Sequence, residues 1–200
     1  MSESIKQRYK LTIEYDGTLY VGFQKQRNFL KNGVVAKSVE SVLEEAIFNL
    51  AQERVKIVVS GRTDAGVHAL GQVLHFDLRR KFKSYQIVRG LNNYLREEDV
   101  VVLRCELVDE NFHACFGSEM RHYRYVLINR DTPLALDRKR AWHVGVGKSL
   151  NVSMMRQASE CLIGRHDFSS FRDAECQSSS PVRTVKKIEI RHPVIEFLLK

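Results

Sequence analysis

The chain has 200 residues, of which 44% are hydrophobic, enough for the core of one larger domain or of two small ones. Its formal charge of +8 favours a polyanionic partner, nucleic acid ahead of an acidic membrane surface, because clustered Lys and Arg side chains displace counterions from phosphates. The four cysteines lie far apart without a C-x-x-C pair, which argues against a zinc knuckle or a disulfide framework. With no apolar run of membrane-spanning length and no signal peptide, we expect a cytoplasmic protein with reduced thiols.

Apolar periodicity predicts the regular elements of the first half of the chain. Apolar and polar residues alternate from Arg8 to Asp16, which is typical of a strand with one buried face. From Val39 to Leu50 apolar residues recur at helical spacing, and Ser38 is placed to cap the first turn. The predicted elements, in chain order, are a strand over 8–16, a helix over 39–50, strands over 55–60 and 72–78, a helix over 87–95 and a strand over 100–107.

This order of elements is the split βαβ arrangement of ferredoxin-like folds. We therefore predict an α+β protein with mixed, mostly antiparallel sheets and helices on one face, whose first ferredoxin-like half spans residues 1–108. The second half, 109–200, begins in the same way. If it repeats the first, it lacks a last helix and strand, so we expect it to be incomplete; the alternative is a smaller, three-stranded unit. Its predicted elements are a strand over 120–128, a helix around 152–162 and strands over 184–190 and 194–199.

The run Gly61-Arg62-Thr63-Asp64-Ala65-Gly66-Val67-His68 holds the leading catalytic candidate. It follows a β-branched strand, and Gly61 releases the backbone at a sheet edge, where rigid scaffolds commonly hold catalytic groups. Arg62 and the backbone N–H groups of the turn are placed to keep the Asp64 carboxylate ionised and therefore nucleophilic. Taken alone, an aspartate in such a turn is more often an Asx-turn residue than a catalyst.

Two histidines and a second aspartate follow this turn and raise the question of a metal site. The spacing of His68, His75 and Asp77 relative to Asp64 matches no common ligand pattern, so we predict no metal ion. His75 and Asp77 are two positions apart on one strand and share a face, and a solvated or interstrand pairing accounts for them equally well. A metal-dependent nuclease that uses Asp64, Asp77 and His75 is the least favoured function.

Basic residues with interleaved aromatics characterise the second half. In the strand Arg121-His122-Tyr123-Arg124-Tyr125, we expect Tyr123 and Tyr125 on one face and Arg124 on the other. A ring at the mouth of a basic cleft can stack on a base, and its hydroxyl can reach a proton; the alternative is that these tyrosines belong to an ordinary core. Basic clusters at 79–83 and 138–140 fit a protein that follows a phosphate backbone.

Several further motifs accompany the run that begins at Gly61 and continues to Phe76. They are Tyr15-Asp16-Gly17-Thr18, Gly22-Phe23-Gln24-x-Gln26, Phe112-His113-Ala114, Arg121-x-Tyr123-Arg124-Tyr125 and His166-Asp167-Phe168-Ser169-Ser170-Phe171-Arg172. Together these motifs resemble those of the TruA-type tRNA pseudouridine synthases. The resemblance extends from about Leu11 to the last residue, and its longest motif, from Gly61 to Phe76, is highly specific.

The resemblance implies a homodimeric enzyme, without cofactor or metal, that isomerises uridine to pseudouridine at positions 38 to 40 of the tRNA anticodon stem-loop. It makes Asp64 the nucleophile, which attacks either the sugar C1′ or the uracil ring, Arg62 the residue associated with base flipping, and Tyr123 the tyrosine beside the target uracil. The chemistry agrees, because the isomerisation is redox-neutral and the base must leave its stem to be reached. The resemblance also implies tRNA contacts at Phe112-His113-Ala114-Cys115-Phe116 and at Glu175-Cys176-Gln177-Ser178-Ser179.

The sequence also departs from the family's pattern. Cys115 stands where the family usually has arginine, which removes a charge from a segment expected to contact tRNA, and Arg96 replaces a common proline. The chain ends at Lys200, before the family's final strand and helix, so we expect the second half to be truncated. The alternative to the enzyme is a non-catalytic RNA-binding module derived from this family.

Overall fold

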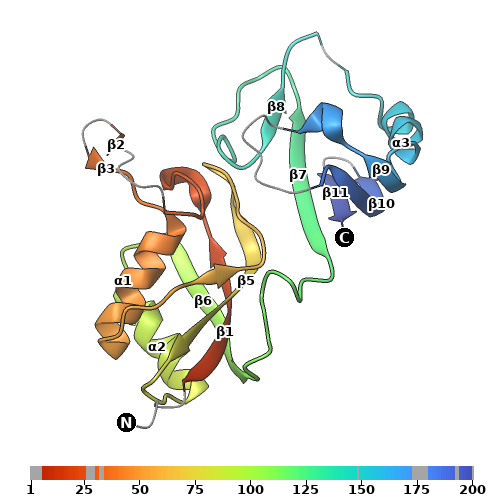
Figure 1. Ribbon diagram of the computed structural model, residues 1–200. Helices are drawn as coiled ribbons and strands as arrows, with labels where there is room; N and C mark the ends of the chain where they lie inside the picture. Colours follow the sequence, from red (N-terminus) through yellow and green to blue (C-terminus); the bar gives the residue numbers. More distant parts are fainter. Residues whose placement is uncertain are drawn as a thin grey trace. The chain divides into compact units, whose positions relative to one another are not determined.

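The computed structural model describes residues 6–25, 30–31, 34–147, 149–172, 180–191 and 194–199. The chain divides into two compact units, one up to Ser118 and one from Glu119 onward. Figure 1 labels the helices and strands of both units. The first unit contains β1 (Gln7–Tyr15), the 3-10 turn η1 (Gly17–Leu19), β2 (Leu30–Lys31), β3 (Val34–Val35), α1 (Val39–Ala51), β4 (Val58–Val59), β5 (Ala69–Leu78), α2 (Ser84–Tyr94) and β6 (Val100–Val108).

The main sheet of the first unit has the strand order β4-β5-β1-β6. The central strand β1 is antiparallel to β5 on one side and to β6 on the other, and β4 is antiparallel to β5. This is the split βαβ arrangement, so the ferredoxin-like fold predicted for the first half is confirmed. The short strands β2 and β3 pair with each other in a separate sheet.

The core of the first unit lies between one face of this sheet and the two helices α1 and α2, which both cover that face (Figure 1). The alternation predicted for β1 places Tyr9, Leu11, Ile13 and Tyr15 in this core, each at most 4% exposed. Burial of a large apolar side chain contributes roughly 1.5–3 kcal/mol, so β1 stabilises the unit along most of its length.

Two of the helices begin at a side chain that caps the first turn. Ser38 accepts the N–H of Ser41 through its hydroxyl at 3.1 Å, and the Ser41 hydroxyl accepts the N–H of Ser38 in return, which confirms the predicted cap of α1. In the second unit, Asn151 accepts the Met154 N–H in the same way. Within the part of the chain that the structure describes, none of the helices is long and apolar enough to cross a membrane.

The other face of the first sheet is polar and is crossed by the segment that follows β6. Arg8 on β1 and His75 on β5 bind the backbone of residues 110–114 from this face. These hydrogen bonds explain why residues 109–118 belong to the first unit, although the sequence assigned them to the second half.

The second unit is a mixed five-stranded sheet with the order β8-β7-β11-β10-β9. The neighbours β10, β11 and β7 repeat the order of β4, β5 and β1, while β8 runs parallel to the end of β7 and β9 extends the opposite edge. The alternative of a three-stranded unit is therefore wrong; that this half is incomplete stays a prediction. The elements are β7 (Arg121–Asn129), β8 (Trp142–Val144), α3 (Val152–Glu160), β9 (Gly164–Asp167), the 3-10 turn η2 (Ser169–Phe171), β10 (Val182–Arg191) and β11 (Val194–Leu199).

Candidate active site

Asp64 lies in the loop between β4 and β5, in a turn that is closed by the backbone. The Val67 N–H donates to the Asp64 carbonyl at 3.2 Å, and Gly66 has a φ of +79°, as the third position of a type II turn requires. The Asp64 carboxylate is exposed and has no hydrogen-bond or ion-pair partner among the described residues. Asp64 is therefore not an Asx-turn residue, and the expected contacts of its carboxylate with Arg62 and the turn amides are not formed there.

Thr63, the residue before Asp64, is bound from two sides. Its hydroxyl lies 2.8 Å from the hydroxyl of Tyr15 at the end of β1, and its carbonyl accepts the N–H of Phe23 at 2.9 Å. Tyr15 is buried, and burial raises the pKa of its hydroxyl, which therefore stays neutral. Either hydroxyl can donate in this bond. The backbone next to Asp64 is thus tied to the centre of the sheet.

The start of the same loop is held by Gln72 on β5. The side-chain amide of Gln72 donates to the Gly61 carbonyl at 2.6 Å, and its side-chain oxygen accepts the Ser60 hydroxyl at 2.7 Å. The Ser60 N–H donates to the carbonyl of Val73 at 2.8 Å. These bonds determine where the chain leaves the pairing of β4 with β5, immediately before Arg62 and Asp64.

The end of the loop packs against the turn that follows β1. A Cβ on Gly17 would lie 2.0 Å from the Val67 carbonyl oxygen, so only glycine permits this approach. His68 Nδ1 lies 3.1 Å from the N–H of Gly17 and 3.0 Å from the Asp16 carboxylate. The first contact needs an unprotonated Nδ1 and the second a protonated one, and either ties His68 to this turn.

Two of the residues weighed as metal ligands are engaged in other contacts. Asp77 accepts two hydrogen bonds from Arg8, its partner on β1, at 2.7 and 2.8 Å, and this holds the pKa of the Asp77 carboxyl below its usual value. His75 accepts the Ala114 N–H. Of the two alternatives for this pair, a solvated or an interstrand pairing, Asp77 shows the interstrand one. Within the described residues no group of three or more His, Cys, Asp or Glu side chains could hold a metal ion.

Tyr123 belongs to the second unit, on β7. Tyr123 and Tyr125 are 38% and 59% exposed, so the alternative that they are ordinary core residues is wrong. Arg124, between them, pairs with Glu196 of β11 at 2.8 Å. The structure thus brings Arg62 and Asp64 together in one loop of the first unit and presents Tyr123 on a strand of the other unit.

One of the two segments predicted to contact tRNA can be described. In residues 112–116, the side chains of Cys115 and Phe116 are exposed, whereas Ala114 is buried and Phe112 and His113 are half-buried. The other predicted contacts lie outside the described residues: Glu175, Cys176, Gln177, Ser178 and Ser179.

The chain matches a known protein family and named relatives along most of its length. Residues 11–116 and 158–197 match the family described as tRNA pseudouridine synthase. The chain is 49% identical over 183 residues to tRNA pseudouridine synthase A of Anaplasma phagocytophilum (strain HZ), a match that covers 92% of this chain and 72% of that protein.

More distant relatives carry the same name. The chain is 46% identical over 185 residues to tRNA pseudouridine synthase A of Ehrlichia canis (strain Jake), covering 92% of this chain and 72% of that protein. It is 44% identical over 183 residues to that of Wolbachia pipientis wMel, covering 92% and 71%. By class the protein is therefore an isomerase. The chain belongs to the tRNA pseudouridine synthase family, which confirms the resemblance seen in its motifs.

Proposed function

We propose that the protein isomerises uridine to pseudouridine in tRNA, at positions 38 to 40 of the anticodon stem-loop, with Asp64 as the nucleophile. The observation that carries the proposal is the loop around Asp64. The loop backbone is held by hydrogen bonds before and after the turn, while the Asp64 carboxylate is exposed and has no partner among the described residues. The relatives' names, which state that they act on tRNA, support the substrate.

Access to the target base requires base flipping. A uridine in a stem is stacked and paired, so it must be extruded before a protein side chain reaches its glycosidic bond. Arg62 is exposed and stands two residues before Asp64 in the same loop. Arg62 would occupy the space that the base leaves while Asp64 meets the extruded nucleoside.

The chemistry itself is redox-neutral. Asp64 attacks either the sugar C1′ or the uracil ring, the bond from N1 to C1′ breaks, the base turns, and a bond from C5 to C1′ forms. The bond to Asp64 breaks before the product leaves, which restores the free carboxylate. N1 gains a proton and C5 loses one, so atoms and electrons balance without a carrier. Tyr123 would stack on the uracil and take the C5 proton. Since Asp64 is solvated in the free protein, the bound substrate must displace water from it before the attack.

Basic surface residues would hold the phosphate backbone. Arg79, Arg80, Lys81 and Lys83 are exposed in the first unit, as is the cluster at 138–140 in the second, within a chain of formal charge +8. Homodimer formation and a cytoplasmic location stay predictions.

Release of tritium from tRNA labelled at C5 of uridine tests the proposal, because the C5 proton is lost in this isomerisation. We expect release with the wild-type chain, without an effect of chelator. The same tRNA with cytidines at positions 38 to 40 is the control and should give none. Salt-dependent tRNA binding without tritium release would contradict the proposal and favour the non-catalytic RNA-binding module.

A further inference from the structure

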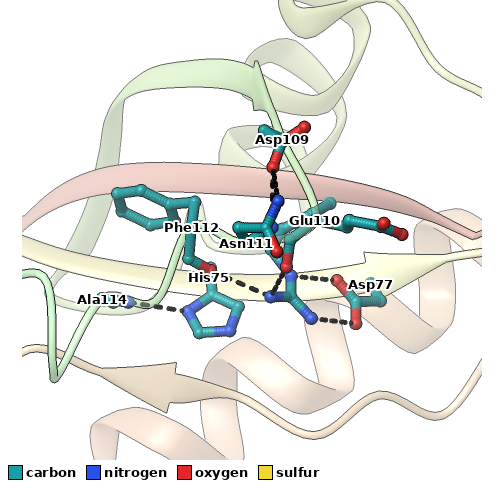
Figure 2. Close-up of polar contacts among 8 residues, drawn as sticks. His75, Asp77, Asp109, Glu110, Asn111, Phe112 and Ala114 are labelled. Carbon is teal, nitrogen blue, oxygen red and sulfur yellow. Dashed lines mark hydrogen bonds and ion pairs between the residues drawn. The ribbon is translucent and has the colours of Figure 1, made fainter.

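A second cluster of polar contacts in the first unit lies outside the Asp64 loop, on the polar face of the sheet (Figure 2). It joins β1 and β5 to residues 110–114, which run over that face after β6. Arg8 donates to the carbonyls of Glu110 and Phe112, the latter at 2.9 Å, and His75 accepts the N–H of Ala114 at 3.1 Å. The backbone of every second residue of this stretch is therefore held by a side chain of the sheet.

Asp77 orients the guanidinium group of Arg8. Two nitrogens of the guanidinium bind the two carboxylate oxygens of Asp77, which leaves its Nη1 for the two carbonyls. The planar guanidinium group has five donors and makes these four hydrogen bonds at once, whereas a lysine has only three donors. Arg8 thus connects the sheet to the start of the crossing segment.

His75 holds the next part of the segment and is 3% exposed. Because Nδ1 accepts the Ala114 N–H, it carries no proton in this arrangement. Burial, with the positive charge of Arg8 and the neighbouring His113, lowers the pKa of His75, and Asp77 opposes this. The neutral form that the hydrogen bond requires is therefore the favoured form.

A series of ring contacts leads from His75 to the surface. The His113 ring meets the His75 ring edge-on at 5.2 Å and stacks on the Phe116 ring at 4.3 Å. The Phe116 N–H also donates to His113 Nδ1 at 3.2 Å, and the Gly117 N–H donates to the His113 carbonyl at 2.7 Å. At the end of the series Phe116 is 86% exposed, as a ring that stacks on a nucleobase must be.

We propose that His75 and Arg8 are positioning residues for RNA: they hold residues 110–114 on the sheet so that Phe116 is presented in one orientation to the bound tRNA. The inference rests on the proposed function, since it assigns tRNA to the exposed side of this segment. In this proposal neither His75 nor Arg8 touches the reacting atoms. They act through Ala114 and His113, and their substitution changes the affinity for tRNA.

Two substitutions of His75 separate positioning from folding. His75→Leu removes the acceptor and keeps apolar volume, whereas His75→Asn retains an acceptor close to the position of Nδ1. We expect the Kd and KM for tRNA to rise about tenfold in His75→Leu, the size expected for loss of one buried hydrogen bond, with kcat changed less than about threefold. His75→Asn should restore affinity to within about threefold of the wild type.

Asn92→Ala is the control for stability. The side chain of Asn92 on α2 binds the N–H and the carbonyl of Val102 on β6, away from this cluster and from the basic residues 79–83, so its loss should weaken folding without changing tRNA affinity. Hydrogen exchange of the Ala114 amide, followed by NMR without RNA, reports the bond to His75 directly. We expect fast exchange in His75→Leu and slow exchange in the wild type and in His75→Asn.

The outcomes distinguish this inference from the proposed function. If the wild-type chain binds tRNA but releases no tritium, the proposed function is contradicted. The tRNA Kd values of the wild type and the two His75 variants, with the exchange rates of the Ala114 amide, still test whether His75 positions the segment. Equal tRNA affinity in the wild type and His75→Leu would overturn the positioning. Equal exchange rates at Ala114 in these two proteins would overturn it as well.

Discussion

Gly17 and Val67 are packed backbone against backbone: a Cβ on Gly17 would lie 2.0 Å from the carbonyl oxygen of Val67 and 2.6 Å from its carbonyl carbon. The turn after β1 therefore lies directly against the end of the Asp64 loop. A side chain at position 17 can be accommodated only by moving one of the two backbones, and the movable one is the exposed loop.

Gly17→Ala should consequently displace the catalytic loop. We expect the free energy of unfolding in urea to fall by ~2 kcal/mol, the usual cost of overpacking, with a clear loss of kcat. Gly71→Ala on β5 is the control, since its Cβ would meet only the Thr12 methyl at 3.9 Å. Similar losses of kcat in both variants would contradict this role of Gly17.

Tyr15→Phe should slow catalysis more than its effect on stability suggests. The substitution removes the hydroxyl that binds Thr63 at 2.8 Å and should lower the free energy of unfolding by about 1 kcal/mol. Tyr9→Phe, on the same face of β1, should cost a comparable amount and leave kcat at the wild-type value. The two unfolding curves and the two kcat values check this, and an unchanged kcat in Tyr15→Phe would refute the anchoring of the loop by Tyr15.

The free energy of unfolding should fall in two steps on acidification. The folded-state pKa of His75 lies below its ordinary 6.5, so its contribution is present above 6.5 and is lost as the pH falls from there through the lower folded pKa. Asp77 has a folded pKa below its ordinary 3.8, so its contribution is lost as the pH falls from 3.8 through that lower value.

Urea unfolding at a series of pH values, on the wild type and two variants, would resolve these steps. His75→Asn should remove the upper step and keep the lower one. Asp77→Asn should keep the upper step and reduce the lower one, to which other carboxyl groups with lowered pKa values also contribute: Glu106, Asp109, Asp167 and Glu189. If both variants show the wild-type dependence of the free energy of unfolding on pH, the ionisation of His75 and Asp77 does not cause the loss of stability in acid.

Phe116→Ala should weaken tRNA binding without destabilising the fold. The ring is 86% exposed, so its removal leaves the core untouched, while loss of one stacked base corresponds to about 1–3 kcal/mol of binding free energy. Tyr94→Ala, at the other end of α2 from the basic cluster and with a ring 48% exposed, should leave the Kd unchanged. Filter binding at one salt concentration compares the three proteins; equal losses for both rings would mean that Phe116 is not a specific contact.

Much of the first unit could be predicted from the sequence, because its elements bury one face each. The alternation in β1 and the helical spacing before Leu50 depend on that burial, and the observed strand and helix follow them closely. The strands β8 and β9 were not predicted. Trp142–Val144 has only three residues, and Gly164–Asp167 is short and mostly exposed, so neither has an apolar period to detect. Their places come from pairing with β7 and β10, which a local pattern does not encode.

In the candidate site, too, the residues of a continuous motif could be predicted, whereas contacts between distant segments could not. Asp64 and Arg62 could be named from a continuous motif, but the bonds that hold them could not, because Tyr15 and Thr63 are 48 positions apart in the chain. The signal for Tyr15 and Gly17 was their place in the motif Tyr15-Asp16-Gly17-Thr18, which carried no assigned role. His75 was seen as a strand residue sharing a face with Asp77, whereas its contact with Ala114 arises only once β6 and the following segment return to the sheet.

The most direct test of the central claim is tritium release from C5-labelled tRNA by Asp64→Asn, measured beside the wild type and beside Asp131→Asn, which removes a charge from an exposed loop of the second unit. The substitution at position 64 keeps the size of the side chain and removes its nucleophilic charge. We expect a loss of roughly a thousandfold or more in kcat with little change in tRNA affinity or stability, and wild-type release by Asp131→Asn. Wild-type release by Asp64→Asn would contradict the assignment of Asp64 as the nucleophile.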